Sequence, residues 1–156
     1  MNRITLCRVL LAAAIVVGLP SLWETVLFSW DPPFAAPALR YGPTHTNYHA
    51  FREFTFAVGA LGVMVWGMAQ PINRRTAGLW IAMALACGFY YGGWWAPWPL
   101  LGLNTPSLVA ELNHEAAPAL AVAAMAIAWR PFHAVAVRSD DSPAPIAARH
   151  STPGSD

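Results

Sequence analysis

The sequence lacks lysine altogether and has few charged residues of any kind. Of its 156 residues, 11% are charged, and all nine basic residues are arginine. A soluble domain of this size carries about a quarter of its residues as charges. The formal net charge of +1 excludes the strongly basic surface that nucleic-acid binding needs. The scarcity of charge predicts that most of the chain lies in a membrane, in contact with lipid.

Cysteine is also scarce, with only Cys7 and Cys87. Each stands in an apolar stretch, far from the other, so the chain has neither a CxxC motif nor the paired spacing of structural zinc sites. We therefore expect both side chains to be buried as small apolar groups, without a disulfide.

What the chain has in abundance is hydrophobic residues, 56% of the total. A helix needs about 20 mostly apolar residues to cross a bilayer. The apolar segments predict an all-α fold, an integral membrane four-helix bundle in one domain, 1–132. The predicted helices cover residues 9–30, 49–69, 77–95 and 108–129, and a disordered cytoplasmic tail, 133–156, follows.

The placement of arginine predicts how this bundle is oriented. Basic residues precede the first helix, fill the short loop between the second and third, and follow the fourth: Arg3, Arg8, Arg74, Arg75, Arg130, Arg138 and Arg149. The positive-inside rule places this side in the cytoplasm. We expect a multi-pass protein of the cell membrane with both termini cytoplasmic and the loops 31–48 and 96–107 outside.

Small residues predict where the helices pack. Gly88 and Gly92 form a GxxxG motif in the third predicted helix, and alanine recurs through residues 116–128 of the fourth. Small side chains let helix backbones approach closely in membranes. We expect both stretches to face neighbouring helices.

Several titratable residues fall inside the predicted helices, at a similar depth near the outer surface. These residues are Glu24 on the first helix, His49 and Glu53 on the second, Tyr90 and Tyr91 on the third, and Glu111, His114 and Glu115 on the fourth. Ionisable groups cost on the order of 2.5–3.5 kcal/mol at the middle of a bilayer. We therefore expect these side chains to face one another inside the bundle, as a buried His/Glu cluster near the outer leaflet.

Pro118 changes the backbone hydrogen bonding next to this cluster. Proline has no N–H group, so it cannot donate to the carbonyl four residues back, which belongs to His114. A free backbone acceptor is therefore predicted beside the His114 imidazole.

One hypothesis for the cluster is acid-base chemistry on a lipophilic small molecule that enters from the outer leaflet. Histidine and carboxylate side chains in partly desolvated surroundings suit isomerase-, cyclase- or hydrolase-like proton transfer without a cofactor. The candidate catalytic residues are Glu24, His49, Glu53, His114, Glu115 and Tyr91. Phe89, Trp94 and Trp95 would line an apolar pocket and favour a developing cation. Alternatively, the tryptophans form an aromatic belt at headgroup level with Trp30, Tyr41 and Trp98.

The layout resembles that of small membrane isomerases of the sterol-isomerase type, which use acidic and histidine side chains inside a helical bundle. The resemblance concerns topology and residue type, and no motif is shared. It implies isomerase-like chemistry on a lipophilic substrate.

A second hypothesis is a metal site. Di-metal carboxylate bundles take a Glu from each of two helices and a Glu-x-x-His pair from each of the other two. Here Glu111 and His114 supply one such pair, and Glu53 is a further candidate ligand. These donors suffice for one Zn or Fe ion.

A third interpretation is a non-catalytic membrane protein, either an accessory subunit or a structural bundle. The polar residues would then only hold helices together, and such interhelical pairs average below about 1 kcal/mol in membranes. Substitutions distinguish the interpretations, because a catalytic cluster would lose activity whereas a structural one would lose stability.

Overall fold

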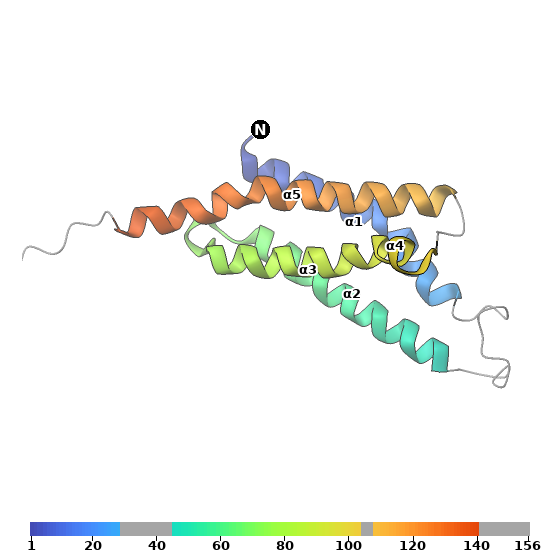
Figure 1. Cartoon of the computed structure of the whole chain (residues 1–156). Helices are drawn as coiled ribbons and strands as arrows, with labels where there is room; N and C mark the ends of the chain where they lie inside the picture. Colours follow the sequence, from blue (N-terminus) through green and yellow to red (C-terminus); the bar gives the residue numbers. More distant parts are fainter. Residues whose placement is uncertain (29–44, 104–107, 141–156) are drawn as a thin grey trace, which may run out of the picture.

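The computed structural model describes residues 1–28, 45–103 and 108–140, and over these residues the regular structure is entirely helical (Figure 1). The long helices are α1 (Arg3–Phe28), α2 (His45–Ala69), α3 (Ala77–Trp95) and α5 (Leu108–Asp140), and the short ones are η2 (Ile72–Arg74) and α4 (Pro97–Leu101). The predicted all-α fold class is confirmed.

The helix bounds differ from the predicted ones chiefly at the ends. α3 begins and ends where the sequence predicts, whereas α1 and α2 begin earlier, at Arg3 and His45. α5 continues to Asp140, so the helix extends past the predicted end at residue 129 and into the stretch 133–140 that was assigned to the tail. Ala, Val and Arg tolerate helical backbone, and a helix propagates easily once it has formed. Residues 141–156 lie outside the described part, as do Trp30, Tyr41 and the loop 31–44.

The short helix α4 falls inside the stretch that the sequence analysis assigned to a loop, 96–107. Pro97 occupies the start of this helix, and Gly102 follows its end with a left-handed φ of 67°. The Gly102 N–H donates to the carbonyl of Trp98 at 2.9 Å. Proline at the first helical position and glycine just past the last are the usual helix boundaries. Pro97 and Gly102 therefore indicate in the sequence where α4 begins and ends.

The four long helices pack as a square in which each has two neighbours. α1 and α3 both contact α5, and both contact α2. α2 and α5 lie diagonally opposite, and their described residues make no close backbone contact. Toward His45, α2 diverges from the other helices, so the bundle is closed near Ala69 and open at the other end (Figure 1).

The core of the bundle consists mainly of methionine and small residues. Its fully buried members include Met64, Met83, Ala117, Ala121, Ala124, Ala128 and Phe132. One face of the alanine run of α5 thus packs inward as predicted, whereas Ala116, Ala119 and Ala126 are exposed. Cys7 and Cys87 are buried and free, also as predicted.

The GxxxG motif of α3 does not pack as expected. A Cβ atom at Gly88 or Gly92 would meet no atom within 4 Å. The glycines that permit close approach are Gly18 of α1, where a Cβ atom would lie 2.9 Å from Cη2 of Trp94, and Gly67 of α2, where a Cβ atom would clash with the side chain of Met83. Spacing alone could not distinguish these positions, because it does not show which face of α3 is covered.

Two arginines bind the carboxyl end of α2. Arg8 donates from Nε to the carbonyl of Met68 at 2.9 Å and from Nη2 to that of Ala69 at 3.3 Å. Arg75 Nε donates to the carbonyl of Gln70 at 3.0 Å. Burial, reinforced by the charge of Arg8, lowers the pKa of the Arg75 guanidinium. These carbonyls lack helical partners and form the negative end of the helix dipole, so the arginines stabilise this end of α2.

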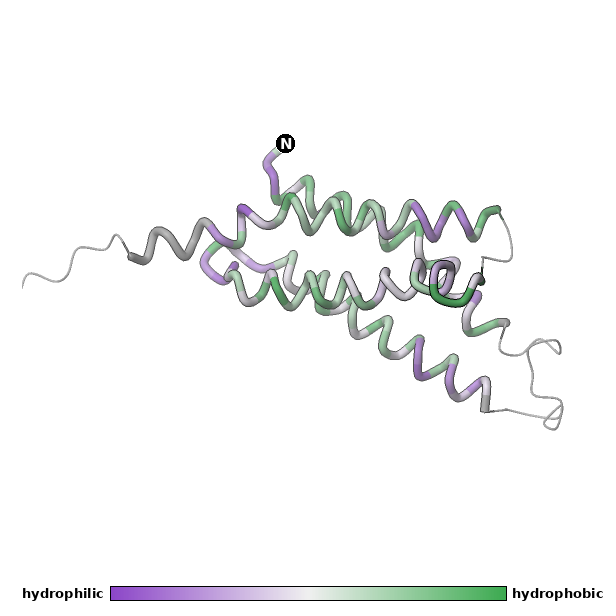
Figure 2. The backbone as a smooth tube through the Cα atoms, viewed as in Figure 1, coloured by the Kyte–Doolittle hydropathy of each residue, from purple (hydrophilic) through white to green (hydrophobic). Residues whose placement is uncertain are grey.

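Among the described helices, α1 is the one that is long and apolar enough to cross a membrane by length and composition. The other three long helices carry charged residues or several Tyr, Trp and Gly residues. Hydrophobic residues nevertheless fill the middle of these helices, and the hydrophilic ones gather nearer the helix ends (Figure 2). Exposed large side chains include Leu19, Phe56, Trp66, Leu85, Phe89, Val122 and Trp129. The described core thus combines alanine with methionine and Phe132, while many large apolar side chains are exposed.

Candidate functional site

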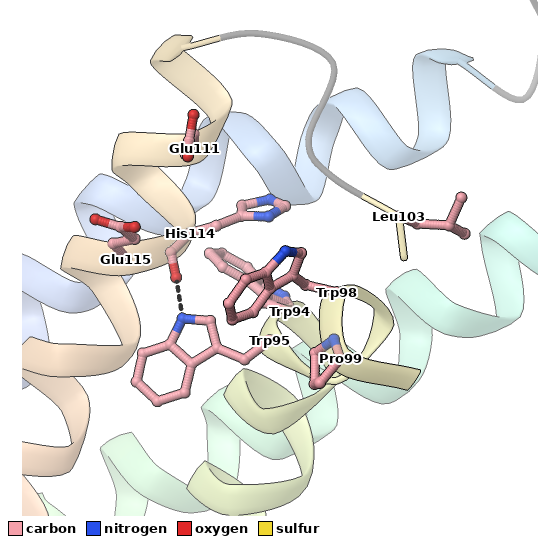
Figure 3. A pocket seen from close by; sticks show the side chains of 8 residues that line it. All are labelled: Trp94, Trp95, Trp98, Pro99, Leu103, Glu111, His114 and Glu115. Atoms are coloured by element: carbon pink, nitrogen blue, oxygen red, sulfur yellow. Dashed lines mark hydrogen bonds between the residues drawn. The ribbon is translucent and has the colours of Figure 1, made fainter. Parts of the chain in front are cut away.

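A cavity of about 880 Å³ lies at the open end of the bundle, between the start of α5 and the segment formed by the end of α3 and α4 (Figure 3). We call it the tryptophan pocket. It is lined by Trp94, Trp95, Trp98, Pro99, Leu103, Glu111, His114 and Glu115. Three indoles, one imidazole and two carboxylates therefore share a single cavity.

The carbonyl group released by Pro118 has a partner on the neighbouring helix. Trp95 Nε1 donates a hydrogen bond of 2.8 Å to the carbonyl oxygen of His114 (Figure 3). The sequence predicted the free acceptor but not its donor. This bond joins α3 to α5 at the pocket and fixes the Trp95 ring in its wall.

Trp94 determines the position of the His114 ring. The centroids of the two rings are 4.6 Å apart, with an interplanar angle of 37°. Trp94 also meets Tyr90 and Tyr91 edge to face, at 5.5 and 5.4 Å, and its far edge lies against Gly18 of α1. Trp94 therefore fills the bundle interior between α1 and α5, and the half-buried His114 ring packs against the Trp94 ring.

The carboxylates lie at the rim of the pocket. Glu111 and Glu115 are exposed and lie about one turn apart on α5. Figure 3 shows their carboxylates projecting away from the indoles, whereas the His114 ring points toward the indoles. Glu24 lies partly buried on α1 and is not among the residues that line the pocket. The His114 imidazole thus rests on an aromatic wall, and the two carboxylates of its own helix lie at the rim.

Glu53 lies in a different cavity. This second cavity, of about 250 Å³, is lined by residues of α1, α2 and α3 that include Thr25, Phe56, Phe89 and Tyr90. Trp94 contributes to both cavities and separates them. The single cluster expected from helix depth is therefore divided in two, because α2 and α5 are diagonal in the bundle.

Two further candidates lie away from the tryptophan pocket. His49 is exposed on the diverging part of α2 and is not among the residues lining the pocket. Tyr91 is only 2% exposed and belongs to the core, so it does not face the pocket. Its hydroxyl is buried and has no hydrogen-bond partner in the described structure. Counting residues along each helix did not show the direction in which each side chain points.

The proposed metal ligands do not come together. Within residues 1–28, 45–103 and 108–140, no three His, Cys, Asp or Glu side chains are grouped so that they could hold a metal ion. Glu111 and His114 share the tryptophan pocket, but Glu53 lies across Trp94 from them. The diagonal placement of α2 and α5 thus separates the third ligand from the other two.

No family model, curated protein or solved structure matches this chain. The pocket's geometry and chemistry therefore carry the functional argument.

Three lining residues were missed as site residues: Trp98, Pro99 and Leu103. The first two belong to α4 and the third follows it. They were missed because the segment was expected to be a loop and Trp98 was assigned to an aromatic belt. Recognising Pro97 and Gly102 as helix boundaries would have placed Trp98 on a short helix that turns back toward α5.

Proposed function

We propose that this chain is a multi-pass membrane protein that crosses the bilayer four times, with both termini in the cytoplasm. The supporting observation is the surface of the bundle, which carries large apolar side chains on all four long helices. A surface of this kind would be unfavourable in water and is suited to acyl chains. The polar groups of α2 and α5 lie near the outer headgroups, where the cost of charge is small.

The distribution of charge supports this orientation. The closed end holds Arg3, Arg8, Arg74 and Arg75, whereas the open end holds Arg52 together with Glu53, Glu111 and Glu115. Arg8 and Arg75 cap α2, which explains their position without a membrane. Arg3 and Arg74 are exposed and cap no helix, so they carry the positive-inside argument.

Cysteine labelling tests this topology. Single cysteines at two exposed positions, Arg74→Cys and Leu103→Cys, are placed in a background with Cys7 and Cys87 changed to alanine. An impermeant maleimide added to intact cells is expected to label residue 103, and to label residue 74 only after the cells are opened. Labelling of both from the same side would contradict the topology.

We further propose that the tryptophan pocket carries out acid-base chemistry on a lipophilic small molecule. The observation on which this depends is His114, whose ring rests on Trp94 and whose carbonyl is held by Trp95, in a cavity that also contains two carboxylates. The volume of about 880 Å³ lies within the range of small-molecule sites, about 300–1,000 Å³.

In this mechanism, the imidazolium of His114 donates a proton to one carbon of a double bond in the bound molecule, and the resulting imidazole takes a proton from a neighbouring carbon, an isomerisation that needs no second reactant. The indoles and carboxylates of the pocket stabilise the cation formed between the two steps. Trp94 keeps the ring in place, and the other indoles hold the apolar body of the substrate.

The experiment compares two histidines of α5 that both lie against tryptophan. His114 contacts Trp94 in the pocket, whereas His133 stacks on Trp129 at the closed end, with ring centroids 3.5 Å apart. Small molecules that co-purify with the full-length protein are identified by mass spectrometry for the wild type, His114→Ala and His133→Ala. We expect His114→Ala to remain helical but to lose the bound molecule, whereas His133→Ala keeps it.

Two outcomes would contradict the proposed chemistry. The first is a wild-type protein that carries no small molecule. The second is a His114→Ala protein that keeps its ligand but unfolds at a lower temperature, because this is the behaviour of a residue that only joins helices.

A further inference from the structure

We infer that the ligand of the tryptophan pocket is a lipophilic organic cation, an amine or quaternary ammonium compound with an apolar body. This inference rests on the proposed function of the pocket and specifies its substrate class. It combines three features of the described residues: the charge of the lining, the type of aromatic ring and the exposure of one indole.

The lining has unbalanced negative charge. Glu111 and Glu115 both line the pocket, and none of its lining residues is an arginine. The arginine at this end of the bundle whose side chain is described, Arg52, lies over the ring of Tyr48 on its own helix, with Cζ 5.9 Å from the ring centroid. α2 is diagonal to α5, so Arg52 does not balance these carboxylates. A cationic ligand would balance them.

The aromatic walls favour the same charge. The indole face has the most negative quadrupole of the aromatic side chains, which attracts cations and repels anions. Trp94 and Trp95 are held in place by His114, through a ring contact and a hydrogen bond respectively. Trp98 is 68% exposed, and its face is open to a ligand.

The placement of these groups suits an amphiphilic ligand. The carboxylates lie on the α5 side of the pocket, and the indoles lie opposite them on α3 and α4 (Figure 3). A molecule entering from the outer leaflet would place its cationic group near Glu111 and Glu115 and its apolar part among the tryptophans. A neutral lipid would use the indoles but would leave the paired carboxylates without a role.

The test measures binding of benzyltrimethylammonium and of its uncharged carbon isostere, neopentylbenzene, to the full-length protein in nanodiscs. Saturation-transfer NMR against empty nanodiscs corrects for partition into lipid. We expect the cation to bind at least about tenfold more tightly than the isostere, because cation-π contacts and carboxylates both act only on the charged probe. Glu115→Gln is expected to weaken binding of the cation several-fold and to leave the isostere unchanged.

Asp140→Asn is the matched control, because it removes one carboxylate at the opposite end of α5. It is expected to leave both affinities unchanged. Trp98→Leu should weaken binding of the cation by about two- to fivefold, the effect of losing one exposed cation-π contact.

The outcomes separate this inference from the proposed function. Equal affinities for the two probes, or equal losses in Glu115→Gln and Asp140→Asn, overturn the cation inference and leave a pocket for neutral lipophilic molecules. Failure of both probes to bind also overturns it, and the proposed function then stands only if the wild type carries a neutral small molecule that His114→Ala loses.

Discussion

The two ends of the bundle differ in how their helices pack. At the closed end, arginines cap the last carbonyls of α2, and Phe132 is fully buried in the core. At the open end, α2 diverges from the other helices, and the tryptophan pocket lies between α3, α4 and α5 (Figure 1). We therefore expect the closed end to contribute more to the stability of the fold than the open end.

Histidine and tryptophan meet at both ends, and their surroundings determine what each pair can do. At the closed end, His133 stacks on Trp129, and Trp80 meets the Trp129 ring edge to face at 4.7 Å. Trp80 Nε1 also donates to the carbonyl of Met125 at 2.9 Å. At the open end, His114 rests on Trp94 beside a cavity with two carboxylates. The same pair of side chains thus lies beside a second tryptophan at one end and beside a cavity with two carboxylates at the other.

The largest effect should come from removing the core at the closed end. Phe132→Ala deletes a side chain that is 0% exposed, and such a truncation costs about 3–5 kcal/mol. We expect a large fall in the thermal midpoint, measured by circular dichroism on the protein purified in detergent. Leu112→Ala, at an exposed position near the pocket, should cost less than about 0.5 kcal/mol. Similar losses in the two variants would show that the ends do not differ in packing.

The cap on α2 should matter less. Arg8→Gln removes donors to the carbonyls of Met68 and Ala69 and is expected to cost about 1–2 kcal/mol. Hydrogen exchange should increase in the last turn of α2, while pocket binding stays unchanged. Arg3→Gln is the control, since Arg3 is exposed on the same helix. If exchange increases equally in both variants, the cap does not stabilise this end.

Much of the fold could be predicted because long apolar segments and helix geometry are local properties. The bounds of α3 and the burial of Ala117, Ala121 and Ala124 follow from periodicity and side-chain size. The free carbonyl of His114 follows from the chemistry of Pro118 alone.

The division of the polar cluster could not be predicted in this way. Glu53 and His114 lie at a similar depth, but a count along each helix does not show that α2 and α5 are diagonal. Nor does it show that Trp94 fills the space between the two cavities. Both are properties of packing between helices, which a single sequence does not display.

A change at Gly18 should affect the open end alone. A Cβ atom there would lie 2.9 Å from Trp94, so Gly18→Ala has to displace the ring on which His114 rests. Overpacking costs about 1–3 kcal/mol, offset in part by the helix propensity of alanine. We expect a net loss of about 1–2 kcal/mol and weaker binding in the tryptophan pocket.

Gly88→Ala provides the comparison, because a Cβ atom at Gly88 meets nothing within 4 Å. That variant should keep its binding and be as stable as the wild type or slightly more stable. If both alanine variants bind the ligand normally, the position of Trp94 does not control the pocket.

The smallest effect tests the link between Trp95 and His114. Trp95→Phe keeps an aromatic ring but removes the Nε1 donor, leaving the His114 carbonyl without its partner, at a cost of about 1 kcal/mol. Pro118→Ala restores a backbone N–H four residues after His114, so the carbonyl regains a helical donor. In the Pro118→Ala background, Trp95→Phe should lower the thermal midpoint by less than half as much as it does in the wild type. A double-mutant cycle then measures a coupling that depends on this carbonyl alone. Equal costs of Trp95→Phe in the two backgrounds would mean that the ring, and not its N–H group, joins α3 to α5 at the pocket.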